Sequence, residues 1–156
     1  MVGASVCSGQ AWIDIFEGPE HLGNQYYSQY CEPYEPIGTE LDITFTANEI
    51  SDWAYLYLEA FGVDPDEETF QNEVFLNGEL VGSLQGFPIA GDCVFQTVFA
   101  AYIGDILQLG DNTLLIVSGY DGGSNWDDYW VRNIRVYPSS IPYQGESWGS
   151  LKAFYR

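Results

Sequence analysis

An Asn-Gly pair between two short apolar runs, in the stretch EVFLNGELVGSL (73–84), restricts the fold of this chain more than any other feature. A two-residue type I′ turn needs positive φ at both central positions, and Asn followed by Gly tolerates this better than almost any other pair. The sequence therefore predicts a β-hairpin with Asn77 and Gly78 at its turn.

This turn also predicts which residues face each other across the hairpin. With Asn77-Gly78 at its tip, Phe75 would lie opposite Leu80 on one face, and Val74 opposite Val81 on the other. Gly82 would leave room for a close neighbour. Because both faces carry apolar residues, we expect the hairpin to lie inside a sheet.

Further strands are expected wherever apolar and polar residues alternate. The clearest example is LDITFTA (41–47), whereas WAYLYLEAFGVD (53–64) is apolar on both faces, which favours a central strand. Gly110 to Asn112 is interpreted as a turn, and the Tyr-rich residues 18–38 as a long loop. The remaining strands are expected at 10–17, 93–103, 113–117 and 129–137.

These patterns predict an all-β fold, an antiparallel β-sandwich of jelly-roll type with about eight or nine strands. With 156 residues and 46% hydrophobic content, the chain can bury one sizeable core, so a single domain over 1–156 is expected. Its sandwich core would span 10–137, and residues 138–156 would form a C-terminal extension.

Charge is strongly segregated along the chain. The four basic residues all lie in the last 25 positions, and 23 acidic residues give a formal net charge of −19. Such a surface repels phosphate backbones and anionic lipids, which argues against nucleic-acid or membrane-surface binding. The charge would instead favour cations, or contact between the basic tail of one copy and the acidic body of another.

The chain has three cysteines and one histidine, without the spacing of a zinc site. An odd number of cysteines allows one disulfide and a free thiol, or no disulfide. Secretion would favour a Cys7–Cys31 bridge, although the sequence does not fix the pairing. The first residues lack the pattern of a signal peptide, and no apolar stretch reaches the ~18 residues of a membrane span.

Four segments, taken in order, resemble the galactose-binding-like β-sandwich of carbohydrate-binding modules and of sugar-binding domains attached to glycosidases. They are AYLYLEAFGVD, EVFLNGELVGSL, LGDNTLLIV and DDYWVRNIRVY, within residues 41–137. The resemblance implies a jelly-roll sandwich with a role in carbohydrate binding. It also implies a structural Ca²⁺ between an acidic residue near the first strand and an Asp that opens the last strand, which here would be Glu17 and Asp128.

The acidic loops independently suggest calcium, because hard cations prefer several carboxylate and carbonyl oxygens. Two loops qualify, DPDEE (64–68) and DGGSNWDD (121–128), although neither fits the EF-hand pattern. The acids could equally be solvated turn residues. The candidate metal ligands are Glu17, Asp64, Asp66, Asp127 and Asp128.

A glycan site needs exposed aromatic rings beside amide and carboxylate groups, and aromatic residues in loops fit this better than those in strands. The candidate ligand-binding residues are Tyr26, Tyr27, Tyr30, Tyr120, Asn125, Trp126 and Trp130. Catalysis is not expected, since the chain has one histidine and no Gly-x-Ser-x-Gly motif.

The sequence thus predicts a non-catalytic, calcium-supported carbohydrate-binding or adhesion module. It would act outside the cell or on the cell surface, with a glycan or cell-surface polysaccharide as partner. The alternative is a self-assembling structural subunit of an extracellular filament, sheath or shell. Such a subunit would add a terminal strand to the sheet edge of a neighbour, using residues 1–9 or 138–156.

Overall fold

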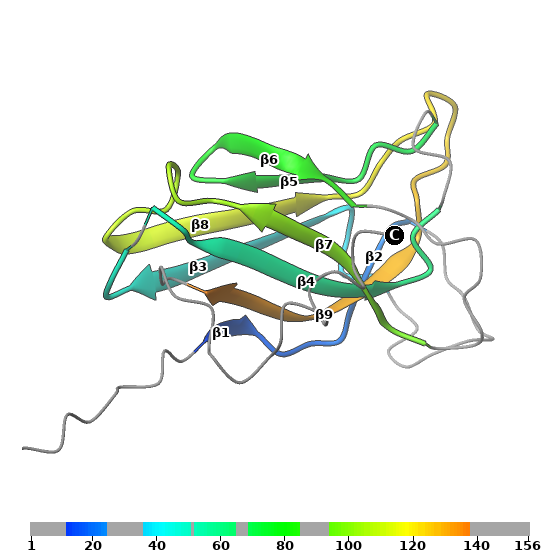
Figure 1. The fold of residues 1–156 in the computed structure, drawn as a ribbon. Coiled ribbons are helices and arrows are strands. Elements are labelled where there is room, and N and C mark those ends of the chain that lie inside the picture. The colour runs from blue at the N-terminus through cyan, green and yellow to red at the C-terminus, as the bar shows by residue number, and fades with distance from the viewer. Residues whose placement is uncertain (1–11, 25–35, 51, 65–68, 85–93, 138–156) are drawn as a thin grey trace, which may run out of the picture.

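The computed structural model describes residues 12–24, 36–50, 52–64, 69–84 and 94–137. These residues form two antiparallel sheets that face each other, so the predicted all-β antiparallel sandwich is confirmed (Figure 1). Nine strands lie within these ranges, in agreement with the eight or nine expected. The same ranges contain no helix long and apolar enough to span a lipid bilayer.

One sheet has five strands in the order β1-β9-β4-β7, with β2 also paired to β9. The two strands at its centre, β9 and β4, carry apolar residues on the face toward the core, as central strands require. The strands are β1 (Ile13–Phe16), β2 (Glu20–Leu22), β4 (Tyr55–Phe61), β7 (Gln96–Tyr102) and β9 (Tyr129–Tyr137).

The second sheet has four strands in the order β3-β8-β5-β6. Its strands are β3 (Glu40–Ala47), β5 (Glu73–Leu76), β6 (Glu79–Ser83) and β8 (Gly110–Val117). The alternation predicted for β3 is confirmed, because Leu41 and Phe45 are buried while Asp42 and Thr44 are exposed.

A hydrophobic core fills the space between the sheets. Each strand contributes to it, from Ile13 of β1 and Leu22 of β2 to Val136 of β9. At about 25 cal/mol per Å² of apolar surface buried, this shared core is the main source of stability for the sandwich. The prediction of a single domain over the whole chain remains a prediction, since it includes residues outside the described ranges.

The predicted hairpin turn is confirmed, with φ of 53° at Asn77 and 82° at Gly78. Phe75 lies opposite Leu80 as expected. The predicted pairing of Val74 with Val81 is wrong, because a β-bulge shifts the register and places Val74 opposite Gly82.

The expectation that the whole hairpin lies inside a sheet is correct only for β5. β6 is an edge strand, and Leu80 on it is 54% exposed. The close neighbour expected at Gly82 is Phe99 of the other sheet, whose Cε2 would lie 3.2 Å from a Cβ at that position.

Three other predictions need correction. Residues 18–38 are not loop throughout, because β2 pairs with the start of β9. Gly110 to Asn112 are the first residues of β8, opposite β3, and the chain turns before them, at 104–106. The central strand begins at Tyr55, leaving Trp53 in a turn with 59% of its surface exposed.

Candidate functional site

The connection from β8 to β9 (118–128) folds back on itself and forms one end of the sandwich (Figure 1). Tyr120 and Trp126 form an isolated antiparallel bridge, and the Asp121 N–H donates to the Asn125 carbonyl at 3.1 Å. The Asp127 N–H donates to the carbonyl of Gly119 at 2.8 Å. These bonds hold the two arms of the loop together.

The Asp121 carboxylate organises the tip of this loop. Its Oδ1 accepts hydrogen bonds from the backbone N–H of Gly123 at 2.7 Å and of Asn125 at 3.2 Å. The Asn125 side chain donates to Oδ2 at 2.9 Å. These donors, the Gly123 N–H foremost, lower the pKa of Asp121, so this partly exposed carboxylate is ionised at neutral pH.

Tyr120 and Trp126 form an aromatic pair on this loop. Their ring centroids are 4.9 Å apart with planes inclined by 36°, and the Tyr120 hydroxyl donates to the Gly123 carbonyl at 2.6 Å. Tyr120 is 45% exposed, and Trp126 is half-buried. The pair is therefore a fixed apolar surface among polar loop groups. The Asn24 side chain adds a contact from the β2 side, donating to the Ser124 carbonyl at 3.2 Å.

Asp127 lies beneath the aromatic pair and is buried. Its Oδ2 accepts hydrogen bonds from the Asn72 side chain at 2.6 Å and from the Asp64 N–H at 2.9 Å. Asn72 Oδ1 accepts from the Gly119 N–H at 2.7 Å, and the Ser118 hydroxyl donates to the Asp127 carbonyl. Burial raises the pKa of Asp127 to about 6. This network ties the loop to the segments before β5 and after β4.

The next residue, Asp128, points elsewhere. Its Oδ1 lies 3.3 Å from Nε2 of the fully buried His21. The His21 ring stacks on Trp130 with centroids 4.2 Å apart and planes inclined by 12°. Gly23 packs so closely against Asp128 that a Cβ there would overlap the carboxylate.

Trp130 was predicted to bind ligand, and the structure corrects this. It is only 3% exposed, enclosed by His21, Phe61 and Phe95 at the start of β9. Tyr129 and Val131, on either side of it, point into the core between the sheets, so Trp130 points to the opposite face, where it packs in a separate cluster with Phe61 and Phe95. Tyr120, Asn125 and Trp126 do lie together as predicted, whereas Tyr26, Tyr27 and Tyr30 lie outside the described residues.

The structure separates several predicted metal ligands. Asp127 and Asp128 point to different partners, and Glu17 is exposed beside Asn133, whose N–H donates to the Glu17 carbonyl at 3.0 Å. Asn133 is five positions beyond Asp128, roughly 15 Å along a strand. Glu17 and Asp128 therefore do not meet, and Asp66 lies outside the described residues.

Asp64 and Asp127 are the predicted metal ligands that come together, through the Asp64 N–H. Within the described ranges, no three His, Cys, Asp or Glu side chains are grouped as metal ligands. Calcium stays a prediction. All three cysteines lie outside the described residues, as do most of the DPDEE loop and the segments 1–9 and 138–156.

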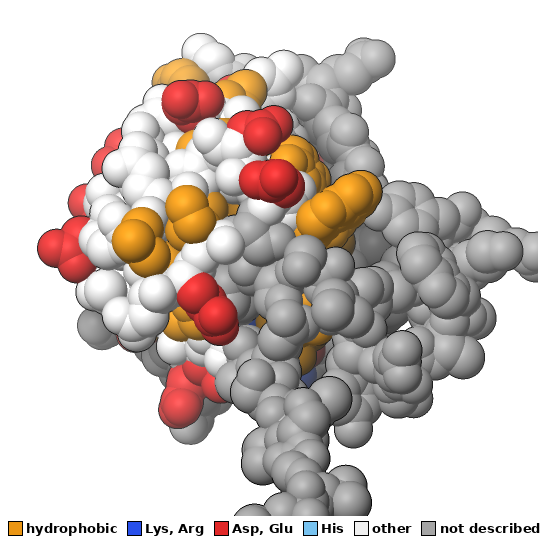
Figure 2. Space-filling model, turned by 60° about the vertical axis from the view of Figure 1, so that its left-hand side comes forward, with side chains coloured by type: hydrophobic (Ala, Val, Ile, Leu, Met, Phe, Trp, Pro, Cys, Tyr) orange, Lys and Arg blue, Asp and Glu red, His pale blue; other side chains and the backbone are white. Residues whose placement is uncertain are grey.

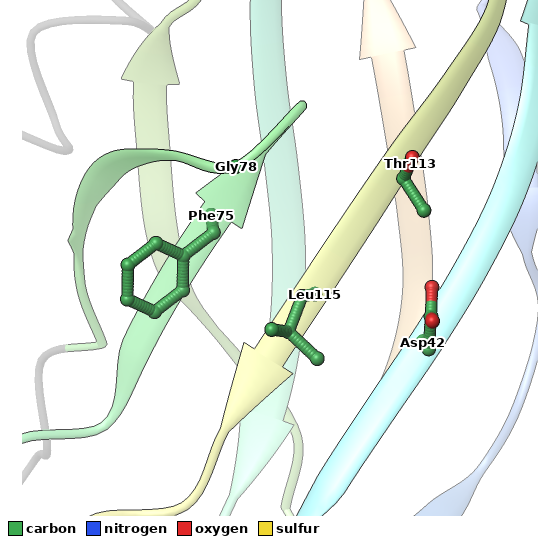
Figure 3. Close-up of a pocket in the computed structure, with 5 residues that line it drawn as sticks. All are labelled: Asp42, Phe75, Gly78, Thr113 and Leu115. Carbon is green, nitrogen blue, oxygen red and sulfur yellow. The ribbon is translucent and has the colours of Figure 1, made fainter.

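A second concave surface lies on the outer face of the four-stranded sheet (Figure 3). It is a shallow hollow of about 350 Å³ in which the Phe75, Leu115 and Asp42 side chains project from neighbouring strands, with Thr113 and Gly78 at its end. Strand register places Asp42 opposite Leu115 and Leu115 opposite Phe75. This hollow has one half-buried aromatic ring, Phe75, and one carboxylate, Asp42. It therefore offers a ligand fewer polar groups than the β8–β9 connection does.

Sequence reasoning did not identify Asn72 and His21 as parts of the site. Both are fully or almost fully buried and polar, yet neither belongs to a motif. The cue for His21 is that it is the only histidine in the chain. Asn72 offers no cue, because its partners Gly119 and Asp127 are 47 and 55 positions away.

No protein-family model matches the chain, and no curated protein matches it by sequence. Solved structures do match. A family 35 carbohydrate binding module from an environmental isolate is 17% identical, with a TM-score of 0.41, over 83% of this chain and 95% of that one. The CBM36-1 domain of a multidomain xylanase from the hindgut metagenome of Trinervitermes trinervoides is 15% identical, with a TM-score of 0.43, over 77% and 92%.

A third match is the Podospora anserina GH26-CBM35 β-(1,4)-mannanase, 13% identical with a TM-score of 0.44. It covers 85% of this chain but 28% of that one. These matches include the kind of domain that the sequence resemblance names. Because identity and TM-score are low, the ligand of this chain has to be inferred from its own residues.

Proposed function

We propose that this chain is a non-catalytic carbohydrate-binding module that holds an uncharged glycan against Tyr120 and Trp126. The observation that supports this most directly is the aromatic pair itself, partly exposed and held in place at the end of the sandwich. The C–H face of a sugar ring is apolar, so it stacks on aromatic rings while the hydroxyls at its edge bind polar groups.

The aromatic pair is preorganised for such a ligand. The Tyr120 hydroxyl is anchored on Gly123, and the Trp126 backbone is fixed by its bridge to Tyr120. Rings that are already ordered lose little conformational entropy on binding, which would otherwise cost about 0.5–1.5 kcal/mol per side chain.

Polar groups border the rings and suit sugar hydroxyls. The Asp121 carboxylate is partly exposed and ionised, so it can accept hydrogen bonds from hydroxyl groups in addition to those from its own loop. Asn24 and Asn125 supply amide groups on either side of the tip. A sugar hydroxyl can donate and accept hydrogen bonds, and this loop offers partners for both.

The charge of the surroundings favours an uncharged glycan. Asp121 is ionised, and neither Arg132 nor Arg135, the basic residues of the described ranges, contacts the loop, because each pairs with an acid on β4 or β1. Figure 2 turns the left-hand side of Figure 1, away from this loop, toward the viewer; there too, acidic side chains lie among hydrophobic ones and Lys and Arg hardly appear. A glycan carboxylate or sulfate would meet like charges.

The proposal includes a supporting Ca²⁺ and a location outside the cell or on its surface, where polymeric glycans are found. The candidate ligands of this ion are Asp64 and Asp127, which are near enough for the charge of Asp64 to affect the pKa of Asp127. If calcium supports the loop, EDTA lowers both the melting temperature and glycan binding, and added Ca²⁺ restores both. Unchanged values in EDTA would remove calcium from the proposal and leave the aromatic site.

A binding assay with insoluble, uncharged polysaccharides tests the proposal. Trp126→Ala and Tyr120→Ala should each abolish retention of the chain, whereas Trp53→Ala should not. Trp53 is a suitable control because it is an exposed aromatic residue before β4, at the opposite end of the sandwich. Retention that survives Trp126→Ala but is lost with Phe75→Ala would move the site to the hollow of Figure 3 and overturn the proposal.

A further inference from the structure

The outer face of the five-stranded sheet carries an aromatic cluster, which we call the aromatic face, formed by Trp12, Tyr55, Tyr57, Tyr102 and Tyr137. Tyr55 lies opposite both Tyr102 and Tyr137 across neighbouring strands. In β4, Leu56 and Leu58 are buried in the core and alternate with Tyr55 and Tyr57, so the two tyrosine rings point outward. Trp12 and Tyr102 are 43% and 41% exposed.

The rings touch one another but share no plane. Trp12 meets Tyr57 at 4.8 Å and 79°, and Tyr137 at 5.0 Å and 53°. Tyr55 meets Tyr102 at 5.9 Å and 72°. These three inclinations are steeper than the 36° between Tyr120 and Trp126, and the resulting uneven surface suits the side chains of another protein.

Charge distinguishes the aromatic face from the rest of the described surface. Arg135 Nε lies 2.6 Å from Asp14 Oδ1, and Arg132 Nε lies 2.8 Å from Glu59 Oε2. These pairs place both arginines of the described ranges on this face, where Asp105 and Asp52 also lie near Tyr102. The outer face of the other sheet carries Glu40, Asp42, Glu73 and Asp111 without a described Lys or Arg.

We propose that the aromatic face is the surface through which two copies of this chain associate about a twofold axis. Tyr, Trp and Arg are the residues that contribute most of the binding energy in protein interfaces. A partner that is itself strongly acidic, as a second copy is, meets less repulsion on the face that holds both arginines of the described ranges. A twofold axis can also bring Arg135 of each copy beside Asp14 of the other.

The size of the face predicts a weak dimer. Four neighbouring strands give a width of about 19 Å and the nine residues of β9 a length of about 30 Å, or roughly 600 Å² per copy. A total near 1,200 Å² is at the low end of specific interfaces, which corresponds to reversible association.

Salt dependence follows from the net charge. Two copies with a formal charge of −19 each repel at long range, whereas contact between aromatic side chains is not screened. From about 10 mM to 1 M NaCl the Debye length falls from roughly 30 Å to 3 Å, so added salt should strengthen the dimer. Association driven by charge attraction between different faces would weaken instead.

Sedimentation velocity of the full chain over a range of concentrations and salt tests this surface. We expect a monomer–dimer equilibrium that shifts at least about tenfold toward dimer at high salt, because like-charge repulsion is then screened. Trp12→Ser and Tyr102→Ser should each give a monomer. Leu80→Ser, on the edge strand β6 of the other sheet and 54% exposed, should associate as the original chain does. Melting temperatures identify any variant that fails to fold.

A charge reversal provides a second arm that keeps the aromatic residues intact. Arg135→Asp should weaken association, and adding Asp14→Arg to it should restore the dimer. A chain that is monomeric at every concentration, a dimer that weakens with salt, or one that survives Trp12→Ser and Tyr102→Ser in folded protein would overturn the proposal. The result is independent of glycan binding, since Trp126→Ala leaves the aromatic face unchanged.

Discussion

Asn77, at the turn of the β5–β6 hairpin, donates a hydrogen bond of 2.9 Å from its side-chain nitrogen to Oδ1 of Asn112 at the start of β8. Asn112 is 2% exposed, and its amide also bonds Gln108, accepting from the N–H and donating to the carbonyl at 2.8 Å each. Through this pair of asparagines, the hairpin turn is joined to the connection between β7 and β8.

The asparagine pair leads to a stability prediction. Asn112→Ala removes the acceptor of the Gln108 N–H and of the Asn77 amide, and the donor to the Gln108 carbonyl; each lost hydrogen bond of this kind costs about 0.5–1.5 kcal/mol. We expect the free energy of unfolding to fall by about 2–4 kcal/mol in urea titrations. Asp111→Asn, at an exposed neighbour, is the control and should change it by less than about 0.5 kcal/mol. Equal effects of the two variants would show that the network contributes little.

The contact between Gly82 and Phe99 gives a second prediction. A Cβ at Gly82 would lie 3.2 Å from the Phe99 ring, so Gly82→Ala forces the two sheets to adjust locally. Overpacking of this kind costs about 1–3 kcal/mol. Thermal unfolding should show a lower melting temperature for Gly82→Ala, while Ser83→Ala on the exposed side of β6 leaves it almost unchanged. A melting temperature that does not fall in Gly82→Ala contradicts the close approach.

Asp127 makes stability depend on pH. Its pKa in the folded chain is about 6, above the ordinary value of 3.8, so the native state binds more protons than the unfolded chain in that interval. This carboxyl therefore makes the free energy of unfolding decrease as the pH rises from about 4 to 6. Above that range the cost of keeping a buried charge is constant.

Asp127→Asn should remove this cost, because the amide oxygen can accept the same hydrogen bonds from Asn72 and Asp64. Measured at pH 7.5 in EDTA, the free energy of unfolding should rise by about 1–3 kcal/mol, equivalent to a shift of up to about two pKa units. The decrease in the free energy of unfolding between pH 4 and 6 should also become smaller. A less stable Asn variant with an unchanged pH profile would contradict this account of Asp127.

Local sequence patterns determined the parts of the fold that could be predicted. The Asn77-Gly78 turn and the alternation of β3 depend on neighbouring residues, and both were correct. The bulge that places Val74 opposite Gly82 depends on contacts between strands and the other sheet, so no local pattern reveals it. β2 was missed because three residues in a Gly- and Tyr-rich segment pair with a strand over 100 positions away.

The site was predictable to a similar extent. Tyr120, Asn125 and Trp126 were found because aromatic and amide residues in a polar loop are conspicuous. Trp130 was predicted to bind ligand but is 3% exposed, because strand pairing places it beside His21, and no local pattern reveals that pairing. The support beneath the loop comes from residues distant in sequence, which composition and spacing do not connect.

An NMR titration of the ¹⁵N-labelled chain with a soluble, uncharged oligosaccharide that matches a retained polysaccharide tests the glycan site most directly. The indole N–H of Trp126 and the amides of the loop around Tyr120 should shift, while the indoles of Trp12 and Trp53 and the amides around Phe75 should not. Shifts confined to the sheet faces, or none with any glycan, would contradict the assignment of this loop as the binding site.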